Sequence, residues 1–178
     1  MYKVLRWFIL SVIVISPGML SSQDSAILNE IRKDLFYSQF DLDKCTDFYN
    51  RIIETGEKSP TFTAYQAAAK ALIAKYSWNP VTKISSLRDV QNLLKTAIDK
   101  EKENLEIRFL RHYIESNIPS YLGFSKNLLE DGLLLKQNIA IVKKLNLDQT
   151  IGDYITTYVQ NINLSKPSKK VKSASLKP

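Results

Sequence analysis

The segment from Pro60 to Tyr76 limits the choice of fold more than any other part of the sequence, because it is apolar on two faces of one helix. A helix of this kind lies in the interior of a domain, because each of its faces has to be covered by a neighbour. A face of alanines also lets the neighbouring helix approach closely. We therefore expect this helix to be central and sandwiched between others. Its large-residue face consists of Phe62, Tyr65, Ala69, Leu72, Ile73 and Tyr76, and its small-residue face consists of Ala64, Ala67, Ala68, Ala71 and Ala74.

Apolar side chains recur at a three-to-four-residue spacing through residues 23–165, which is the period of a helix. No segment alternates convincingly as a strand would. Residues that favour helix starts precede these segments, either as side-chain caps or as a proline in the first turn. We therefore predict a single all-α domain of about seven helices over residues 23–165. The expected starts are Ser25, Asp41, Pro60, Ser86, Asn104, Ser125 and Asp148.

The first twenty-two residues have the pattern of a signal peptide. Lys3 and Arg6 provide a positive start, and an uncharged apolar run follows from Trp7 to Ile15. Small and helix-breaking residues come next, so we expect removal of residues 1–22 and a mature start near Gln23. The protein would then be periplasmic or secreted.

A membrane anchor is the alternative reading of this N-terminus. Even an apolar helix extended from Trp7 to Leu20 would be roughly 21 Å long, which is short of the ~30 Å hydrocarbon layer. Pro17 and Gly18 would also break it earlier. Length therefore favours a removed signal.

The basic net charge of +7 belongs to the two ends of the chain. Residues 23–165 carry equal numbers of basic and acidic side chains, whereas residues 166–178 carry five lysines and no acid. This tail is rich in serine and proline and has too few apolar residues to offset the entropy of ordering. We expect it to be disordered, with at most weak contact with anionic surfaces and no specific nucleic-acid partner.

The segment LLKTAIDKEKENLEIRFLR at residues 93–111 resembles the junction between two tetratricopeptide repeats. Residues 67–123, with AKYSWNPVTK, AIDKEKENLEIRFLR and NIPSYLGF in order, also resemble an uncharacterised family of exported bacterial proteins with such degenerate repeats. The resemblance implies a stack of antiparallel helical hairpins (TPR-like). Lys102 stands where the repeat has proline, and Arg111 where it has a small residue, so a compact stack is expected instead of a regular superhelix. The family has no established activity to transfer.

Catalytic patterns are missing from the sequence. His112 is the only histidine, which excludes a site with several histidine ligands, and we expect it to be a partly exposed surface residue. Cys45 is the only cysteine and falls on an apolar helical stripe, where an inert buried thiol is expected. The four glycines after residue 22 form no phosphate-binding loop or calcium loop. We therefore predict no catalytic residue, metal or cofactor, and a protein that is not an enzyme.

One polar stripe is a candidate binding site. Arg108, Arg111, His112 and Glu115 are spaced so that they line one side of a helix. If the stripe faces a groove, the arginines can take a peptide carboxylate through paired hydrogen bonds. Alternatively, it is a solvated surface held by an Arg111–Glu115 pair. Tyr121, in the aromatic loop that follows, could form one wall of the groove.

Three functions remain open from the sequence. The first is an exported module that binds a peptide or another envelope or secreted protein through a helical surface. The second is a carrier of a small apolar ligand, with several tyrosines lining its pocket. The third is an unrecognised hydrolase with two carboxylates that meet only in space. An open polar and apolar groove would favour the first, a large cavity between helices the second, and converging carboxylates in a cleft the third.

Overall fold

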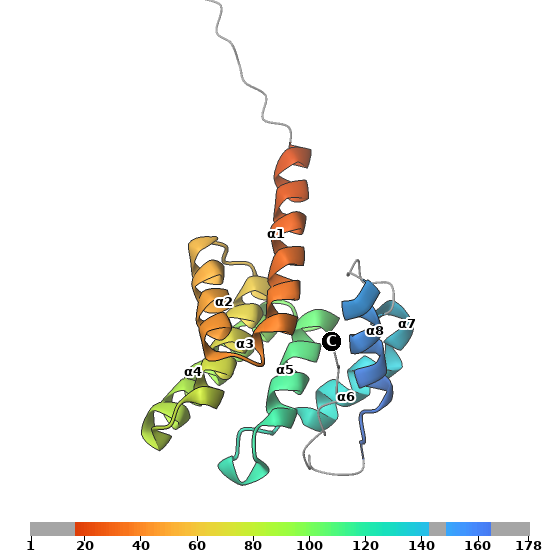
Figure 1. Ribbon diagram of the computed structural model, residues 1–178. Coiled ribbons are helices and arrows are strands. Elements are labelled where there is room, and N and C mark those ends of the chain that lie inside the picture. The colour runs from red at the N-terminus through yellow and green to blue at the C-terminus, as the bar shows by residue number, and fades with distance from the viewer. Residues whose placement is uncertain (1–16, 143–148, 165–178) are drawn as a thin grey trace, which may run out of the picture.

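The computed structural model describes residues 17–142 and 149–164. This part of the chain is helical and contains no strand, which confirms the all-α fold class (Figure 1). The elements in chain order are α1 (Pro17–Ser38), α2 (Leu42–Glu54), α3 (Pro60–Tyr76), α4 (Pro80–Lys100), α5 (Leu105–Asn117), the short 3-10 helix η1 (Ser120–Leu122), α6 (Leu128–Gln137), α7 (Ile139–Val142) and α8 (Gln149–Gln160).

Several predictions lie outside the described residues. They are the apolar run of the signal peptide, the helix cap at Asp148 and the basic tail at residues 166–178. None of the helices within the described ranges is both long enough and apolar enough to cross a lipid bilayer.

Three of the predicted helix starts are confirmed. The Asp41 side chain accepts hydrogen bonds from the backbone N–H groups of the first turn of α2, and Asn104 does the same for α5. Pro60 occupies the first turn of α3, and the preceding Ser59 caps it. These positions were predictable because each cap satisfies backbone donors that the first turn of a helix leaves without partners.

The expected starts of three other helices were wrong. The fourth helix begins at Pro80 instead of Ser86, because the Asn79 side chain caps it and proline fits a first turn. The first helix begins at Pro17 instead of Ser25. The sixth begins at Leu128 because Ser125 does not cap a helix, and its hydroxyl donates instead to the backbone carbonyl of Glu115 at 2.8 Å.

The helix α3 is central, as its two apolar faces predict. It contacts α1, α2, α4 and α5, and Ala64, Ala67 and Ala69 have no exposed surface. Alanines allow these neighbours to approach closely, since they add little beyond the backbone. The large side chains of α3 reach into the main core, which also contains Phe48, Ile107 and Leu110.

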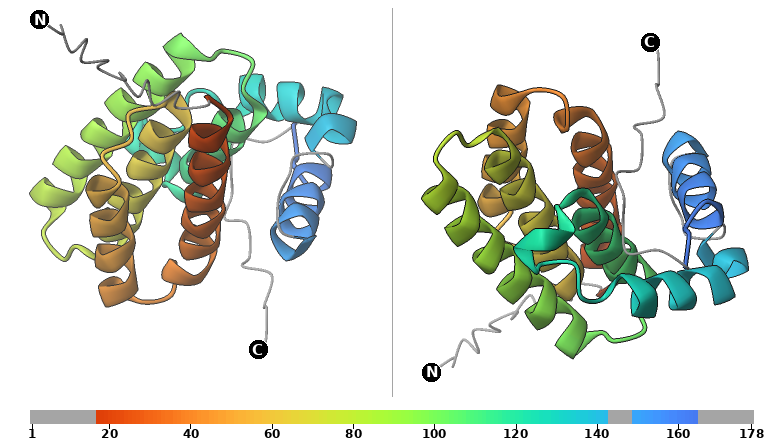
Figure 2. Two further views of the ribbon diagram at one scale, coloured as in Figure 1. Left: turned by 90° about the horizontal axis from the view of Figure 1, so that it is seen from above. Right: turned by 90° about the horizontal axis from the view of Figure 1, so that it is seen from below.

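The helices α1, α3 and α5 run in the same direction. Arg32 contacts Glu106 near the start of α5, whereas Gln39, just after α1, contacts Tyr113 near the end of α5. The α3 residue Tyr65 also reaches Glu106. The antiparallel α2 and α4 connect these three helices, and α6 to α8 lie on the other side of α1 and α5 (Figures 1 and 2). The C-terminal ends of α1, α3 and α5 consequently lie at one end of the domain.

Candidate functional site

The polar stripe of α5 forms a buried ionic cluster with α6. Arg111 binds Asp131 through two hydrogen bonds, Nε to Oδ2 at 2.6 Å and Nη2 to Oδ1 at 2.7 Å. Arg108 Nη1 donates to Asp131 Oδ1 at 2.9 Å, and its Nε donates to the backbone carbonyl of Lys102 at 2.7 Å. Asp131 is fully buried, whereas Glu130, which contacts both guanidinium groups, has a side chain that is 60% exposed. One buried and one exposed carboxylate therefore neutralise two cations.

This arrangement changes the interpretation of Arg108 and Arg111. Both side chains are buried, and their hydrogen-bonding groups face α6 instead of a solvent-filled groove. The basis for their predicted contact with a peptide carboxylate is thereby removed. The alternative, a solvated stripe with an Arg111–Glu115 pair, is wrong as well, because Arg111 hydrogen-bonds Asp131 and Glu130.

Glu115 fixes the start of α6. Its two carboxylate oxygens accept the backbone N–H of Asn127 at 2.8 Å and the Asn127 side-chain amide at 2.6 Å. Burial raises the pKa of Glu115, and the bonds from Asn127 act in the opposite direction. Glu115 is therefore a structural link between α5 and the N-terminal end of α6.

His112 is buried, with 6% of its surface exposed, so the expectation of a partly exposed surface histidine was wrong. Its Nδ1 lies 2.8 Å from the hydroxyl of Tyr158, and Ser116 Oγ lies 2.9 Å from the same hydroxyl. Burial lowers the pKa of His112 to about 4, so the imidazole is neutral at pH 7. The three side chains attach α8 to α5.

A third buried carboxylate, Glu106, was not among the residues that the sequence indicated. Glu106 accepts hydrogen bonds from Arg32 Nε and Nη2, both at 2.7 Å, and from the Tyr65 hydroxyl at 2.6 Å. Burial beside this carboxylate raises the pKa of Tyr65. Arg32 and Glu106 are 74 positions apart, so the spacing of residues within one helix could not predict this pair. Each of the buried carboxylates Glu106, Glu115 and Asp131 thus has close structural partners.

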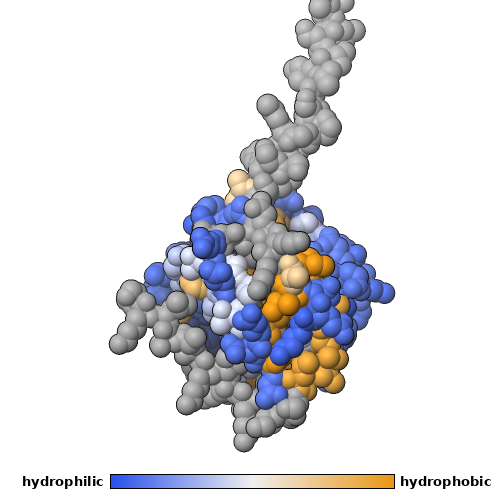
Figure 3. All heavy atoms as spheres, turned by 90° about the vertical axis from the view of Figure 1, so that its right-hand side faces the viewer, coloured by the Kyte–Doolittle hydropathy of each residue, from blue (hydrophilic) through white to orange (hydrophobic). Residues whose placement is uncertain are grey.

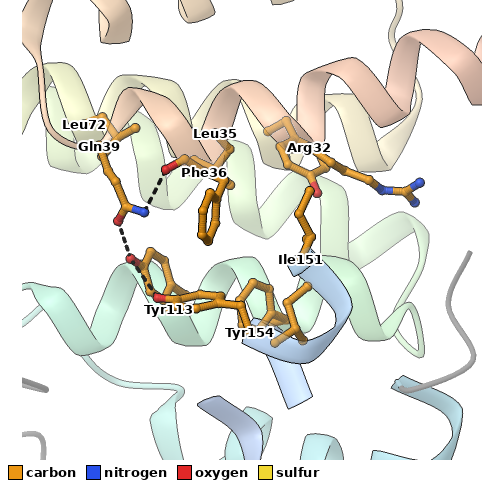
Figure 4. A pocket seen from close by; sticks show the side chains of 11 residues that line it. Arg32, Leu35, Phe36, Gln39, Leu72, Tyr113, Ile151 and Tyr154 are labelled. Carbon is orange, nitrogen blue, oxygen red and sulfur yellow. Dashed lines mark hydrogen bonds between the residues drawn. The ribbon is translucent and has the colours of Figure 1, made fainter. Parts of the chain in front are cut away.

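A small cavity of about 40 Å³ lies between α1, α3, α5 and α8 (Figure 4). At its edge, the Tyr113 hydroxyl donates to Gln39 Oε1 at 2.8 Å and the Tyr154 hydroxyl donates to that of Tyr113 at 3.4 Å. A pocket for an organic ligand has a volume of roughly 300–1,000 Å³. This cavity has room for only a few water molecules, and it gives no support to the carrier hypothesis.

Three of the tyrosines considered for a carrier pocket, Tyr113, Tyr154 and Tyr158, pack against other rings. Tyr154 meets Phe36 edge to face at 5.4 Å between ring centroids, and Tyr158 meets Phe109 in the same way at 5.4 Å. Such contacts are typical of an aromatic core. These rings cover the cavity and hold α8 against α1 and α5.

A larger and more open depression follows the outer side of α3. We call it the α3 groove, and its volume is about 340 Å³. It has polar and apolar parts and includes an ion pair between Lys70 Nζ and Asp89 Oδ2 at 3.2 Å. It is lined by Tyr49 of α2, Gln66 and Lys70 of α3, and Asp89, Asn92 and Leu93 of α4.

Two other predicted residues have clear positions. Tyr121 lies on η1 with 85% of its surface exposed, separate from the buried stripe that it was expected to flank. Cys45 is fully buried and its thiol contacts the Ser38 carbonyl at 3.0 Å; burial raises the pKa of this thiol. Within residues 17–142 and 149–164, no group of three or more His, Cys, Asp or Glu side chains is placed to hold a metal ion.

Comparison of the chain with family models, with curated proteins and with solved structures finds no match. Function is therefore inferred from the chain's own residues. Of the three features that distinguish the possible functions, the open polar and apolar groove is the one with a volume suited to a ligand.

Replacing Asp131 with asparagine should strongly destabilise the fold. The variant removes the buried anion that the two guanidinium groups share and leaves them the exposed Glu130; breaking a buried ion pair typically costs about 3–5 kcal/mol. Glu130→Gln is the matched control, since it touches the same arginines from the surface and should cost at most about 1 kcal/mol. Urea unfolding followed by circular dichroism measures both. Equal losses in the two variants would show that Asp131 has no special role.

His112 should make the fold less stable as the pH falls from about 6.5 to about 4. Its pKa is lower in the folded protein, so over this window the unfolded chain binds more protons, and acid favours unfolding by up to about 3 kcal/mol. The variant His112→Gln retains a hydrogen-bonding group for Tyr158 but does not titrate. We expect the difference in unfolding free energy between wild type and variant to shrink or reverse as pH falls across this window. Parallel pH profiles of the two proteins would contradict the assignment.

Proposed function

We propose that this chain is a helical protein-interaction module that binds an extended peptide segment of another envelope or secreted protein in the α3 groove. The observation that carries this proposal is the groove itself, an open depression of about 340 Å³ over the central helix. The cavity between α1, α3, α5 and α8 is much smaller, and the buried carboxylates are engaged in structural contacts. The groove is therefore the best-supported place for a ligand.

The chemistry of the α3 groove suits a peptide backbone. Gln66 and Asn92 are accessible, and within the described residues their side-chain amides make no hydrogen bond. Each amide offers both donors and an acceptor, which match the N–H and C=O groups of an extended chain. Tyr49 and Leu93 are half-buried and provide apolar contact beside these amides. The combination favours a peptide over a purely apolar ligand.

The proposal includes the TPR-like hairpin stack that the resemblance to the exported bacterial family implies, and the order of consecutive helices is compatible with it. Proteins built from stacked helical hairpins present extended surfaces on which peptides bind. Here α2, α3 and α4 are consecutive, and α3 packs between the other two. The α3 groove thus combines residues from the two helical hairpins that share α3.

Export by signal-peptide cleavage is the second part of the proposal. The α1 residues Ile27 and Leu28 pack against the main core, and a chain that starts near Gln23 keeps both of them. We expect the protein recovered from the periplasm or medium to lack about the first 22 residues, as measured by intact mass. A full-length mass in the membrane fraction would support an anchor and contradict export by cleavage.

The groove is tested by photo-crosslinking in the native cell. A benzophenone amino acid at position 92 should crosslink one specific protein, whereas the same probe at the exposed Gln137 of α6 should not. The pair of changes Gln66→Ala and Asn92→Ala should weaken capture of that protein roughly tenfold, because two hydrogen-bonding groups are lost. Exposed Gln160→Ala is the control substitution. Identical crosslinks from positions 92 and 137, or unchanged capture by the folded double variant, would contradict the proposal.

A further inference from the structure

Three turns meet at one end of the domain and expose large apolar side chains there. Because α1, α3 and α5 run in parallel, the turns that follow them lie at the same end of these helices. In Figure 1 the turn after α3 and η1 lie at the lower edge of the domain, and the turn after α1 lies higher. We call this surface the aromatic end. Its exposed residues are Phe40 (70% exposed) after α1, Trp78 (91%) and Val81 (78%) after α3, and Tyr121 (85%) after α5.

The turns that carry these side chains are tied to one another by the fold. Lys75 Nζ and the Tyr76 hydroxyl both donate to the backbone carbonyl of Gln39, at 2.9 and 3.1 Å, and so tie the end of α3 to the turn after α1. A small second core of Ala74, Leu87 and Phe124 ties α3 and α4 to the segment that follows η1. The three turns therefore have defined positions relative to one another.

The charge around Trp78 and Tyr121 is positive. Residues 58–88 contain no aspartate or glutamate, and Lys75 and Lys83 lie on either side of Trp78 in the sequence. The segment 116–129 contains Lys126 and no acid. The turn after α1 differs, because it is followed by the carboxylates Asp41 and Asp43, of which Asp41 caps α2. Two of the three turns thus combine apolar side chains with cations alone.

We propose that the aromatic end docks on the interface of an anionic phospholipid bilayer. Tryptophan and tyrosine favour the headgroup region, because each has an apolar ring and a polar group. Lysines beside them are attracted to anionic lipid headgroups. The apolar side chains protrude from separate turns, and neither the cavity nor the α3 groove includes them. Protrusions of this kind suit a deformable lipid interface better than a rigid protein pocket.

Docking in this orientation is compatible with the proposed peptide site. The residues of the α3 groove lie along the middle of α2, α3 and α4, away from the turns of the aromatic end. A membrane below these turns would leave the groove open at the side. The lipid proposal is therefore independent of the peptide proposal.

A different apolar surface provides a comparison. Figure 3 faces the side formed by α6 to α8 and shows hydrophobic surface there; Leu129, Leu133 and Ile141 are large exposed apolar side chains of α6 and α7. Glu130 lies in the same helix as two of them. The exposed apolar side chains of α6 and α7 thus have an acidic residue in the same region. The charged residues in the turns after α3 and α5 are all basic.

The test uses the fluorescence of Trp78 in the full chain. The sequence has two tryptophans, so Trp7→Phe leaves Trp78 as the only reporter. With vesicles of phosphatidylglycerol and brominated phosphatidylcholine, we expect a blue shift and quenching of Trp78. The control chain carries Trp7→Phe, Trp78→Phe and Ile53→Trp, which places the reporter near the C-terminal end of α2, away from the proposed interface. A second control chain carries Leu133→Trp on α6 in place of Ile53→Trp. The tryptophan of each control chain should stay unquenched.

Charge is tested in the same assay. Lys75→Gln with Lys83→Gln should weaken vesicle binding about fivefold for each lysine removed. Lys58→Gln with Lys100→Gln removes the same charge at the opposite end and should change binding little; circular dichroism melting checks that both variants fold. Three results would each overturn the proposal: an unquenched Trp78, equal quenching at position 53 or 133, or equal effects of the two lysine pairs. If Trp78 is unquenched and Trp78→Ala also abolishes capture of the partner protein, the aromatic end binds a protein instead of a membrane.

Discussion

The contact of Asp131 with Arg108 and Arg111 is the interaction on which the rest of the structure depends. Two guanidinium groups on one buried helix face would carry a large desolvation cost without an anion beside them. Asp131 supplies that anion from α6, and the bidentate geometry with Arg111 fixes its position. Because the charges of α5 are neutralised inside the protein, nearly the whole surface of this helix can be buried.

The need to pair the buried polar side chains of α5 also determines where α6 and α8 lie. Glu115 holds the N-terminal end of α6 through Asn127, so α6 is bound to α5 at two points along its first turns. Neutral His112 forms a hydrogen bond with the Tyr158 hydroxyl, and this bond positions α8 beside α5. Polar groups on one helix therefore specify the placement of two later helices, although hydrophobic packing alone would allow them several orientations.

Local features of the fold were predictable, and long-range pairings were not. The two apolar faces between Pro60 and Tyr76 indicated the central helix, and Asp41 and Asn104 indicated helix starts, because these signals act within a few residues. The stripe from Arg108 to Glu115 was correctly placed on one helix, but its polarity indicated solvent. Its partners Asp131 and Tyr158 are 20 and 46 positions from Arg111 and His112, so the sequence alone did not show that the stripe is buried.

The internal pairing of α5 also determines which surfaces remain for binding. Charged groups that satisfy one another inside the fold have little affinity left for an external ligand, because a new contact would first have to break an existing one. Amides and apolar rings at the surface face no such competition. Gln66 and Asn92 in the α3 groove, and Trp78 and Tyr121 at the aromatic end, are in this position. This is why we propose a peptide as the ligand of the first pair and a lipid interface as the ligand of the second.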